Sequence, residues 1–223
     1  MLYTAAQCRE LDRLAIEDHG VPGFELMRRA GRAAFEALVD AWPDAASVCV
    51  CCGKGNNSGD GYIVAGLAQN LGMKVRLLQV GDAAALTGDA GRARDWAVGQ
   101  GVTVTPWAPA SQEDVDSLDG DVVVDALLGT GITGAVREPY SELIEAINSA
   151  GKPVLAIDVP SGVIADTGAA VGTAVRATLT VTFIGRKIGL HTGPGAALAG
   201  GVIYADISVP GEIFAEQRGV PLL

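Results

Sequence analysis

The sequence has little histidine and no segment suited to a membrane. Its 223 residues include only two histidines, His19 and His191, which excludes a histidine-rich metal site. The N-terminal stretch MLYTAAQCREL carries a charge at Arg9 and lacks the apolar region of a signal peptide. Residues 188–205 bear no formal charge, but Pro194 and several glycines make them a poor membrane helix. We therefore expect a cytoplasmic protein.

Cysteine is also scarce and unevenly placed. Of the four cysteines, Cys49, Cys51 and Cys52 stand together in one apolar run. Such a run is typical of a buried strand, in which adjacent side chains point to opposite faces of the sheet. The three thiols therefore make a poor zinc site. Together with Cys8, we expect them to be small apolar core residues in a reducing cytosol.

Positive charge is in deficit. The net charge of -10 and the isoelectric point near 4.6 argue against nonspecific electrostatic binding to nucleic acid or anionic membranes. Hydrophobic residues make up 49% and charged residues 19%, which is typical of a folded globular chain. The length is sufficient to bury a core without disulfides or metals. We predict a single domain over residues 1–223, with 210–223 as a peripheral tail or the start of a linker.

Two helices are predicted before the first strand. Thr4 and Gln7 fit a capping box at the start of the first helix, which Gly20 would close. The second helix is predicted from Phe24 to Asp40 and stops before Pro43. Its apolar residues recur at helical spacing and predict one buried face: Leu26, Met27, Ala30, Ala34 and Leu38.

Strands and helices then alternate along the chain. We expect strands at 47–52, 74–80, 102–106, 121–128, 153–157, 179–183 and 202–207. We expect helices at 60–71, 88–98, 112–118 and 138–149, and loops at 53–59, 83–85 and 195–201. Several strands are continuously apolar, as strands covered on both faces should be. The pattern predicts an α/β fold: a Rossmann-like, doubly wound, mostly parallel sheet with helices on both faces.

Three loops that follow strands carry polar residues and should converge, because ligands of doubly wound sheets bind outside the carboxyl ends of the strands. The first loop contains GKGNNSGDG, a near miss to the dinucleotide fingerprint with Ser58 at the third glycine position. Asn56, Asn57 and Asp60 suit hydroxyls, amides or a hard cation, whereas Asp60 would repel a pyrophosphate. Alternatively, these side chains satisfy the loop backbone and cap the helix.

The second loop begins inside an apolar strand. Asp125 interrupts that strand, and a carboxylate there needs a partner or a cation. Gly129, Thr130 and Gly131 offer consecutive N–H groups that can form an anion-binding nest. The alternative is a solvated aspartate near the strand end, followed by an ordinary turn.

The third loop and a later strand supply further candidates. Asp158 ends a buried strand, where a carboxylate can act as general acid or base. Ser161 has neither a nucleophile-elbow context nor a histidine nearby, so we expect it to donate a hydrogen bond or ligate a cation. Lys187 follows another strand and can neutralise a substrate phosphate. The alternatives are an aspartate that only caps the turn and a solvated lysine.

The motifs GKGNNSGDG, VDALLGTG and IDVPSG, in this order and spacing, resemble the YjeF N-terminal domain family of NAD(P)H-hydrate epimerases. The opening helices and the segment VTFIGRKIG resemble that family too, so the similarity covers about residues 2–210. The resemblance implies a Rossmann-like fold and an isomerase of metabolite repair. Such an enzyme interconverts the R and S epimers of hydrated NADH and NADPH, so that an S-specific dehydratase can restore the cofactor. It also implies a bound potassium ion and a homodimer.

The resemblance also implies which residues of this chain form the site, because they occupy matching positions in the family's motifs. Potassium would be held by Asn57, Asp125 and Ser161. The hydrated dinucleotide would contact residues of all three loops, namely Asn56, Asn57, Ser58, Gly59, Asp60, Gly129, Thr130, Gly131, Ile132, Thr133, Gly134, Ala135 and Asp158. Two departures are visible. Ser58 stands where the family often has glycine, and LMRRAG replaces the common LMENAG, which leaves dimer contacts open.

The hydrate is a hemiaminal at C6 of the reduced ring, so epimerisation needs a proton donor and acceptor near its hydroxyl. Asp158 is our candidate for that role, and Lys187 is a second candidate.

Two other interpretations of the function compete with the epimerase. Asp82 after the second strand could bind a ribose in an NAD-dependent dehydrogenase, although the imperfect glycine fingerprint and Asp60 argue against it. The other is a non-catalytic dinucleotide-binding or scaffold domain of the same fold. Whether the chain stands alone or is fused to the dehydratase stays open.

Overall fold

The central element is a seven-stranded sheet in which every neighbouring pair is parallel. The computed structural model describes residues 1–107, 118–217 and 219–221. The strand order across the sheet is β4 (Val104–Pro106), β3 (Lys74–Gln79), β2 (Ser47–Cys52), β5 (Val122–Ala126), β6 (Val154–Ile157), β7 (Leu179–Phe183) and β9 (Gly201–Ala205). The predicted parallel, doubly wound sheet is therefore confirmed.

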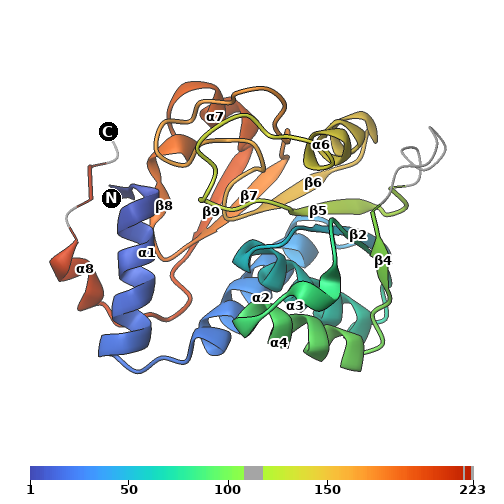
Figure 1. Cartoon of the computed structure of the whole chain (residues 1–223), viewed down its shortest axis with the longest axis horizontal. Helices are drawn as coiled ribbons and strands as arrows, with labels where there is room; N and C mark the ends of the chain where they lie inside the picture. The colour runs from blue at the N-terminus through green and yellow to red at the C-terminus, as the bar shows by residue number, and fades with distance from the viewer. Residues whose placement is uncertain (108–117, 218, 222–223) are drawn as a thin grey trace.

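Helices cover both faces of this sheet. Figure 1 shows α2 (Gly23–Ala41), α3 (Asn56–Asn70) and α4 (Gly88–Gly99) on one side, and α6 (Tyr140–Ser149) and α7 (Gly193–Leu198) on the other. No helix in the described part of the chain is both long and apolar enough to span a membrane.

The N-terminal segment packs beside the edge of the sheet. β1 (Leu2–Tyr3) pairs in parallel with β8 (Arg186–Lys187) as a separate two-stranded sheet. Helix α1 (Ala5–Arg13) follows and continues as a π-helical turn over Leu14–Asp18. The predicted capping box is confirmed: Gln7 N donates to Thr4 Oγ1 at 3.2 Å, and Thr4 N donates to Gln7 Oε1 at 2.9 Å. The pairing of β1 with β8 fixes α1, which directly follows β1, beside β8 (Figure 1).

The chain reverses its direction of travel across the sheet between β2 and β5. From β2 it proceeds outward to β3 and β4, then returns to place β5 on the other side of β2. The loops after β2 and β5 therefore diverge around a crevice at the carboxyl ends of the strands, the usual ligand site of such sheets. The two strand ends remain joined, since Gly53 N donates to Ala126 O at 3.2 Å.

The core lies on both faces of the sheet, as the apolar strands predict. In β2, Val50 and Cys52 pack into the cluster under α2 and α3, while Cys49 and Cys51 pack into the cluster under α6. All four cysteines are buried free thiols. The alternation within β2 explains why three nearby thiols do not meet on one face.

Several predicted boundaries were wrong. Helix α3 begins at Asn56 instead of Asp60, because Gly55 is extended and its carbonyl accepts from the backbone and hydroxyl of Ser58. The glycine-rich loop is therefore only Gly53–Gly55 long. Short helices occupy two expected loops, at Ala83–Ala85 and in α7. The strand expected at 121–128 spans only Val122–Ala126, because Leu127 N donates to the Asp125 carboxylate instead of to a neighbouring strand.

Two regions complete the description. A helix was expected at 112–118, and all of it except Leu118 lies outside the described residues. Near the C-terminus, α8 (Ile213–Glu216) carries the buried Ile213, and Val220 forms an antiparallel bridge with Leu2. A 3₁₀ turn at Ile188–Leu190 links β8 to α7.

Candidate functional site

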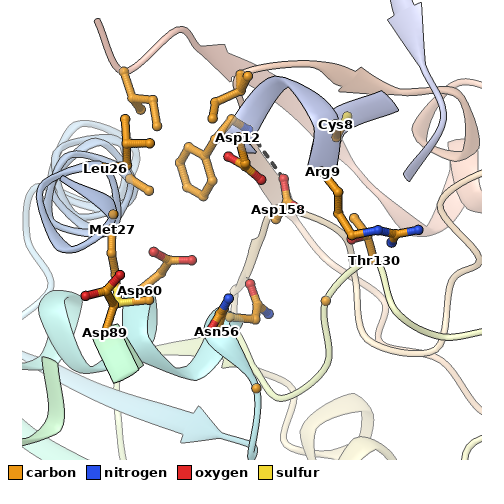
Figure 2. A pocket seen from close by; sticks show the side chains of 18 of the residues that line it. Cys8, Arg9, Asp12, Leu26, Met27, Asn56, Asp60, Asp89, Thr130 and Asp158 are labelled. Carbon is orange, nitrogen blue, oxygen red and sulfur yellow. Dashed lines mark hydrogen bonds between the residues drawn. The ribbon is translucent and has the colours of Figure 1, made fainter. Parts of the chain in front are cut away.

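A pocket of about 470 Å³ opens where the polar loops meet at the carboxyl ends of the strands. One wall comes from the residues that follow β2, β5, β6 and β7, and the other from α1, α2 and the start of α4 (Figure 2). We call these the strand-end wall and the helical wall. The polar side chains that line the pocket are Cys8, Arg9, Asp12, Asn56, Asn57, Asp60, Asp89, Thr130, Asp158 and Lys187.

An ion pair stands at the centre of the strand-end wall. Lys187 Nζ donates to Asp158 Oδ1 and, at 3.0 Å, to the carbonyl of Phe183. The Asp158 carboxylate also accepts from Thr182 Oγ1 at 3.1 Å, and its backbone has a φ of 66°. This left-handed conformation is unusual for a residue other than glycine and is often found at functional sites. The pair is thus held in one orientation at the pocket surface.

The two members of this pair differ in exposure. The Lys187 side chain is 3% exposed and that of Asp158 is 18% exposed. Burial lowers the pKa of Lys187, but the Asp158 carboxylate and other nearby groups outweigh it and raise that pKa above its ordinary value. Lys187 is therefore a buried cation committed to Asp158, and the interpretation as a solvated lysine was wrong.

A second cluster of oxygens lies behind the pocket around Leu128. Asp125 is fully buried, and its carboxylate accepts from Ser161 N at 2.8 Å, Ser161 Oγ at 2.6 Å and Leu127 N at 3.2 Å. Ser161 Oγ also accepts from Leu128 N at 2.9 Å, and Asn57 Nδ2 donates to Leu128 O at 3.2 Å. The three residues that the family resemblance assigns to a cation therefore meet around the backbone of Leu127 and Leu128.

The Asp125 carboxyl at the centre of this cluster is buried without a cationic partner among the described residues. Burial raises the pKa of Asp125 to about 6, although the hydrogen bonds from Ser161 and Leu127 oppose the rise. No lysine or arginine of the described residues pairs with this carboxylate. Within the same described part of the chain, no group of three or more histidine, cysteine, aspartate or glutamate side chains is placed to hold a metal. A cation here would rely on carboxylate, hydroxyl, amide and carbonyl oxygens.

The first turn of α3 presents polar side chains to the pocket. Asn56, Asn57 and Asp60 line it, whereas Ser58 and Gly59 do not. Ser58 is fully buried, and its hydroxyl donates to Gly55 O at 2.5 Å. The serine that departs from the family pattern therefore stabilises the helix start from within.

Close backbone contact sets the position of this turn. A Cβ atom on Gly53 would lie 1.9 Å from the carbonyl oxygen of Leu127, so only glycine fits between the loops after β2 and β5. Beneath the turn, buried Gln79 donates to Gly53 O at 2.7 Å and accepts from Tyr62 Oη at 2.8 Å. The sequence reasoning missed Gln79, although a polar residue at the end of an apolar strand was a readable signal.

The glycine-rich loop after β5 lines one end of the pocket. Gly129, Thr130 and Gly131 line it, as expected for a backbone nest. Further along the loop, Ile132, Thr133, Gly134 and Ala135 do not line it, and Gly134 and Ala135 are exposed. Their contacts with a ligand stay a prediction.

The helical wall was missed by the sequence reasoning. Helix α1 contributes Arg9 and Asp12, and α2 contributes Leu26 and Met27 beside Phe183 of β7. Arg9 makes no hydrogen bond or ion pair with any described residue, and it lies on the same side of the pocket as Thr130 in Figure 2. One end of the pocket is therefore cationic and glycine-rich, and the other is apolar and bordered by carboxylates.

The carboxyl groups of the pocket shift one another's pKa values. Asp12 is exposed through the pocket mouth, but the surrounding protein removes enough water to raise its pKa to about 6, against the lowering effect of Lys187. Burial raises the pKa of Asp60 well above its ordinary value, and the charges of Asp158 and Asp12 raise it further. Perturbed carboxyl groups that gather in one pocket mark a functional site.

Comparisons with known proteins agree with this geometry. A family model described as YjeF-related protein N-terminus matches residues 23–189. The chain is 45% identical over 214 residues to the bifunctional NAD(P)H-hydrate repair enzyme Nnr of Coxiella burnetii, covering 96% of this chain and 43% of that protein. It is 38% identical over 203 residues to the NAD(P)H-hydrate epimerase of Limosilactobacillus fermentum, covering 91% of this chain and 95% of that protein.

A solved structure supports the fold. The crystal structure of yeast ynu0, YNL200c, matches with a TM-score of 0.77 at 20% identity, covering 86% of this chain and 84% of that one. The present chain spans less than half the length of the bifunctional relative from Coxiella burnetii.

Proposed function

This chain belongs to the family of YjeF-related N-terminal domains, and we propose that it is an NAD(P)H-hydrate epimerase that interconverts the R and S epimers of hydrated NADH and NADPH. The observation that carries the proposal is the Asp158–Lys187 pair, held in the wall of a pocket with one cationic, glycine-rich end and one apolar end. Relatives named for this activity match nearly all of the chain, which supports the same reading.

The charge distribution of the pocket orients the substrate. Its diphosphate binds at Gly129–Gly131 and Arg9, because backbone N–H groups and an unpaired guanidinium favour an anion. The other end contains Asp12, Asp60 and Asp158, which repel a diphosphate. The hydrated ring therefore lies at that end, against the apolar residues of α2 and β7.

A potassium ion fits the oxygen cluster behind the pocket. Asn57, Asp125 and Ser161 would hold it, because their oxygens are hard ligands and the buried Asp125 carboxylate has no cationic partner among the described residues. Bound there, the ion supplies positive charge that keeps Asp125 ionised. The chain's own contribution is to fix the N–H and the carbonyl of Leu128, and through them the start of the Gly129–Gly131 nest.

Asp158 is the proton-transfer group of the proposed reaction. Loss of the C6 hydroxyl needs a proton on its oxygen, and readdition of water needs an acceptor for a proton. The Asp158 carboxylate reaches the pocket, while Lys187 and Thr182 hold its orientation from behind. Lys187, the second candidate, is a positioning residue here because its ammonium group is already bound to Asp158 and Phe183 O.

The wider setting is part of the proposal. We expect residues 1–223 to act as one cytoplasmic domain that forms a homodimer and hands the S epimer to an S-specific dehydratase. The relatives of which this chain spans less than half are named bifunctional NAD(P)H-hydrate repair enzymes, which supports a link to a second repair activity.

The test starts from purified R-hydrate of NADPH, with potassium and an excess of S-specific dehydratase. Recovery of NADPH is followed with and without the protein, and with Asp158→Asn. We expect a rate well above spontaneous epimerisation that the variant loses while it keeps its fold and binds the hydrate. Binding without acceleration by the wild-type protein would overturn the epimerase and favour a non-catalytic binding domain.

A further inference from the structure

We propose that Asp60 is the second proton-transfer group of this site and acts on the face of the substrate ring opposite Asp158. The inference rests on the proposed epimerase function and adds a catalytic role to a residue expected only to bind. It follows from what inversion at C6 requires and from where the carboxyl groups of the pocket lie.

Inversion at C6 requires proton transfer on both faces of the ring. On one face, an acid protonates the C6 hydroxyl, the N1 lone pair forms a C6=N1 double bond, and the C6–O bond breaks to release water. On the other face, a water oxygen forms a new bond to C6 and gives its proton to a carboxylate, while the electron pair returns to N1. The net change is inversion alone, once solvent has returned a proton to the acid and taken one from the carboxyl group on the other face. Because the reaction runs in both directions, each face needs a group that both donates and accepts.

Asp60 is placed for the face that Asp158 does not serve. It projects from the first turns of α3, whereas Asp158 follows β6, and both line the pocket. In Figure 2 the two carboxyl groups lie on opposite sides of the open space, with Asn56 below them. A flat ring held between Asp60 and Asp158 would present one face to each carboxyl group.

The Asp60 carboxyl is free of other commitments. It is half-buried, and it makes no hydrogen bond or ion pair with any residue that the structure describes. A carboxyl group in such a place is costly for folding unless a ligand uses it. By contrast, Asp158 is held by Lys187 and Thr182, so the two sides of the pocket offer one fixed and one unpartnered carboxyl.

The charges around Asp60 favour its protonated form. Burial and the negative charges of Asp158 and Asp12 raise its pKa, and Lys187 alone opposes them. The pocket is also lined from the neighbouring helices by Cys8 and Arg9 of α1, Met27 of α2 and Asp89 of α4. The raised pKa favours the protonated form of Asp60, which can donate a proton on its side of the ring, while the Asp158 carboxylate held by Lys187 accepts one on the other.

The other two acids of the pocket fit this role less well. Asp12 lies on the same side as Asp158 in Figure 2 and is exposed at the mouth. Asp89 is bound by Arg92 at 3.2 Å. Both therefore serve as comparisons for the loss of one negative charge from the same pocket.

The experiment measures kcat, KM and their pH profiles in the dehydratase-coupled assay for Asp60→Asn, Asp60→Glu, Asp12→Asn and Asp89→Asn. We expect Asp60→Asn to lower kcat at least 100-fold with KM within threefold, and to remove one limb of the pH profile. Asp60→Glu should restore part of kcat, and Asp89→Asn, which removes one negative charge from the pocket but no proton-transfer group, should lower kcat less than tenfold. Melting temperatures establish that each variant is folded.

The outcomes separate this inference from the proposed function. An active wild type together with an Asp60→Asn variant within fivefold of it would overturn the role of Asp60 and leave the epimerase intact. A loss confined to Asp12→Asn would transfer the role to that residue and overturn ours. A folded wild type that binds hydrate without epimerising it would overturn the proposed function and this inference together.

Discussion

The two walls of the pocket are built on different principles. In the strand-end wall, Asp125, Ser161, Asp158 and Lys187 all bind one another or nearby peptide groups. In the helical wall, Arg9 and Asp12 of α1 make no hydrogen bond with any described residue. Apart from the unpartnered Asp60, the strand-end wall is a pre-organised polar network, whereas the helical wall presents unpartnered charges on an apolar helical surface.

This difference predicts how each wall responds to substitution. Removing a member of a buried network leaves its partner unsatisfied, so stability and activity fall together. Removing an unpartnered charge relieves repulsion or leaves stability unchanged, so any functional loss appears by itself. Variants of the strand-end wall should therefore lower both the melting temperature and the activity, whereas variants of the helical wall should change the kinetics alone.

The largest effect is expected for Lys187→Met in the strand-end wall. It leaves the Asp158 carboxylate without its buried counter-ion, and breaking such a pair costs about 3 kcal/mol. Chemical denaturation should show this loss, and epimerase activity should fall at least tenfold. Arg186→Met is the control, because Arg186 only stacks on Tyr204 at 5.1 Å and should lose about 1 kcal/mol or less. Equal losses for both variants would refute a special role for the buried pair.

A smaller effect is expected for Ser161→Ala in the same wall. The variant removes a 2.6 Å hydrogen bond to buried Asp125 and leaves Leu128 N without its acceptor. We expect a loss of about 2 kcal/mol and a higher potassium concentration for half-maximal activity. Ser47→Ala is the matched control, since its hydroxyl donates to Asp121 at 2.7 Å at an exposed site and should cost less than about 1 kcal/mol. An unchanged potassium dependence would count against the proposed cation site.

The strand-end wall was also the wall that the sequence predicted. Its residues follow apolar strands in recognisable loops, and parallel strands bring their carboxyl ends to one edge, so Asp125, Asp158 and Ser161 were placed without coordinates. The start of α3 was misplaced because glycine and asparagine favour loops, and the buried Ser58 hydroxyl that completes the turn is a tertiary feature. The position of α1 depends on the pairing of β1 with β8, far apart in sequence, so Arg9 and Asp12 carried no signal.

Arg9→Gln tests the first unpartnered charge of the helical wall. Because the guanidinium has no partner among the described residues, its loss should leave the melting temperature unchanged. Its proposed contact with the diphosphate predicts a rise in KM of about tenfold with kcat nearly constant, the size of one charge-assisted hydrogen bond. Arg13→Gln, one turn along the same helical segment and paired with Glu10 at 2.8 Å, should keep the wild-type KM. A lower kcat with unchanged KM would place Arg9 elsewhere in the mechanism.

Asp12→Asn should produce the smallest effect, visible as a dependence of stability on pH. The pKa of Asp12 is raised to about 6, mainly because the surrounding protein removes water from the carboxyl, so the folded protein binds its proton more tightly than the unfolded chain does. Wild-type stability therefore falls as pH rises from about 4 to about 6, and the variant escapes this fall. Because the carboxyl is exposed at the pocket mouth, solvent screening limits the gain above pH 6 to about 1–2 °C in melting temperature. The gain should vanish near pH 4 and be absent for Asp44→Asn on an exposed turn. A variant that melts below the wild type at pH 7 would show instead that Asp12 stabilises the helical wall, and the contrast between the two walls would fail at this residue.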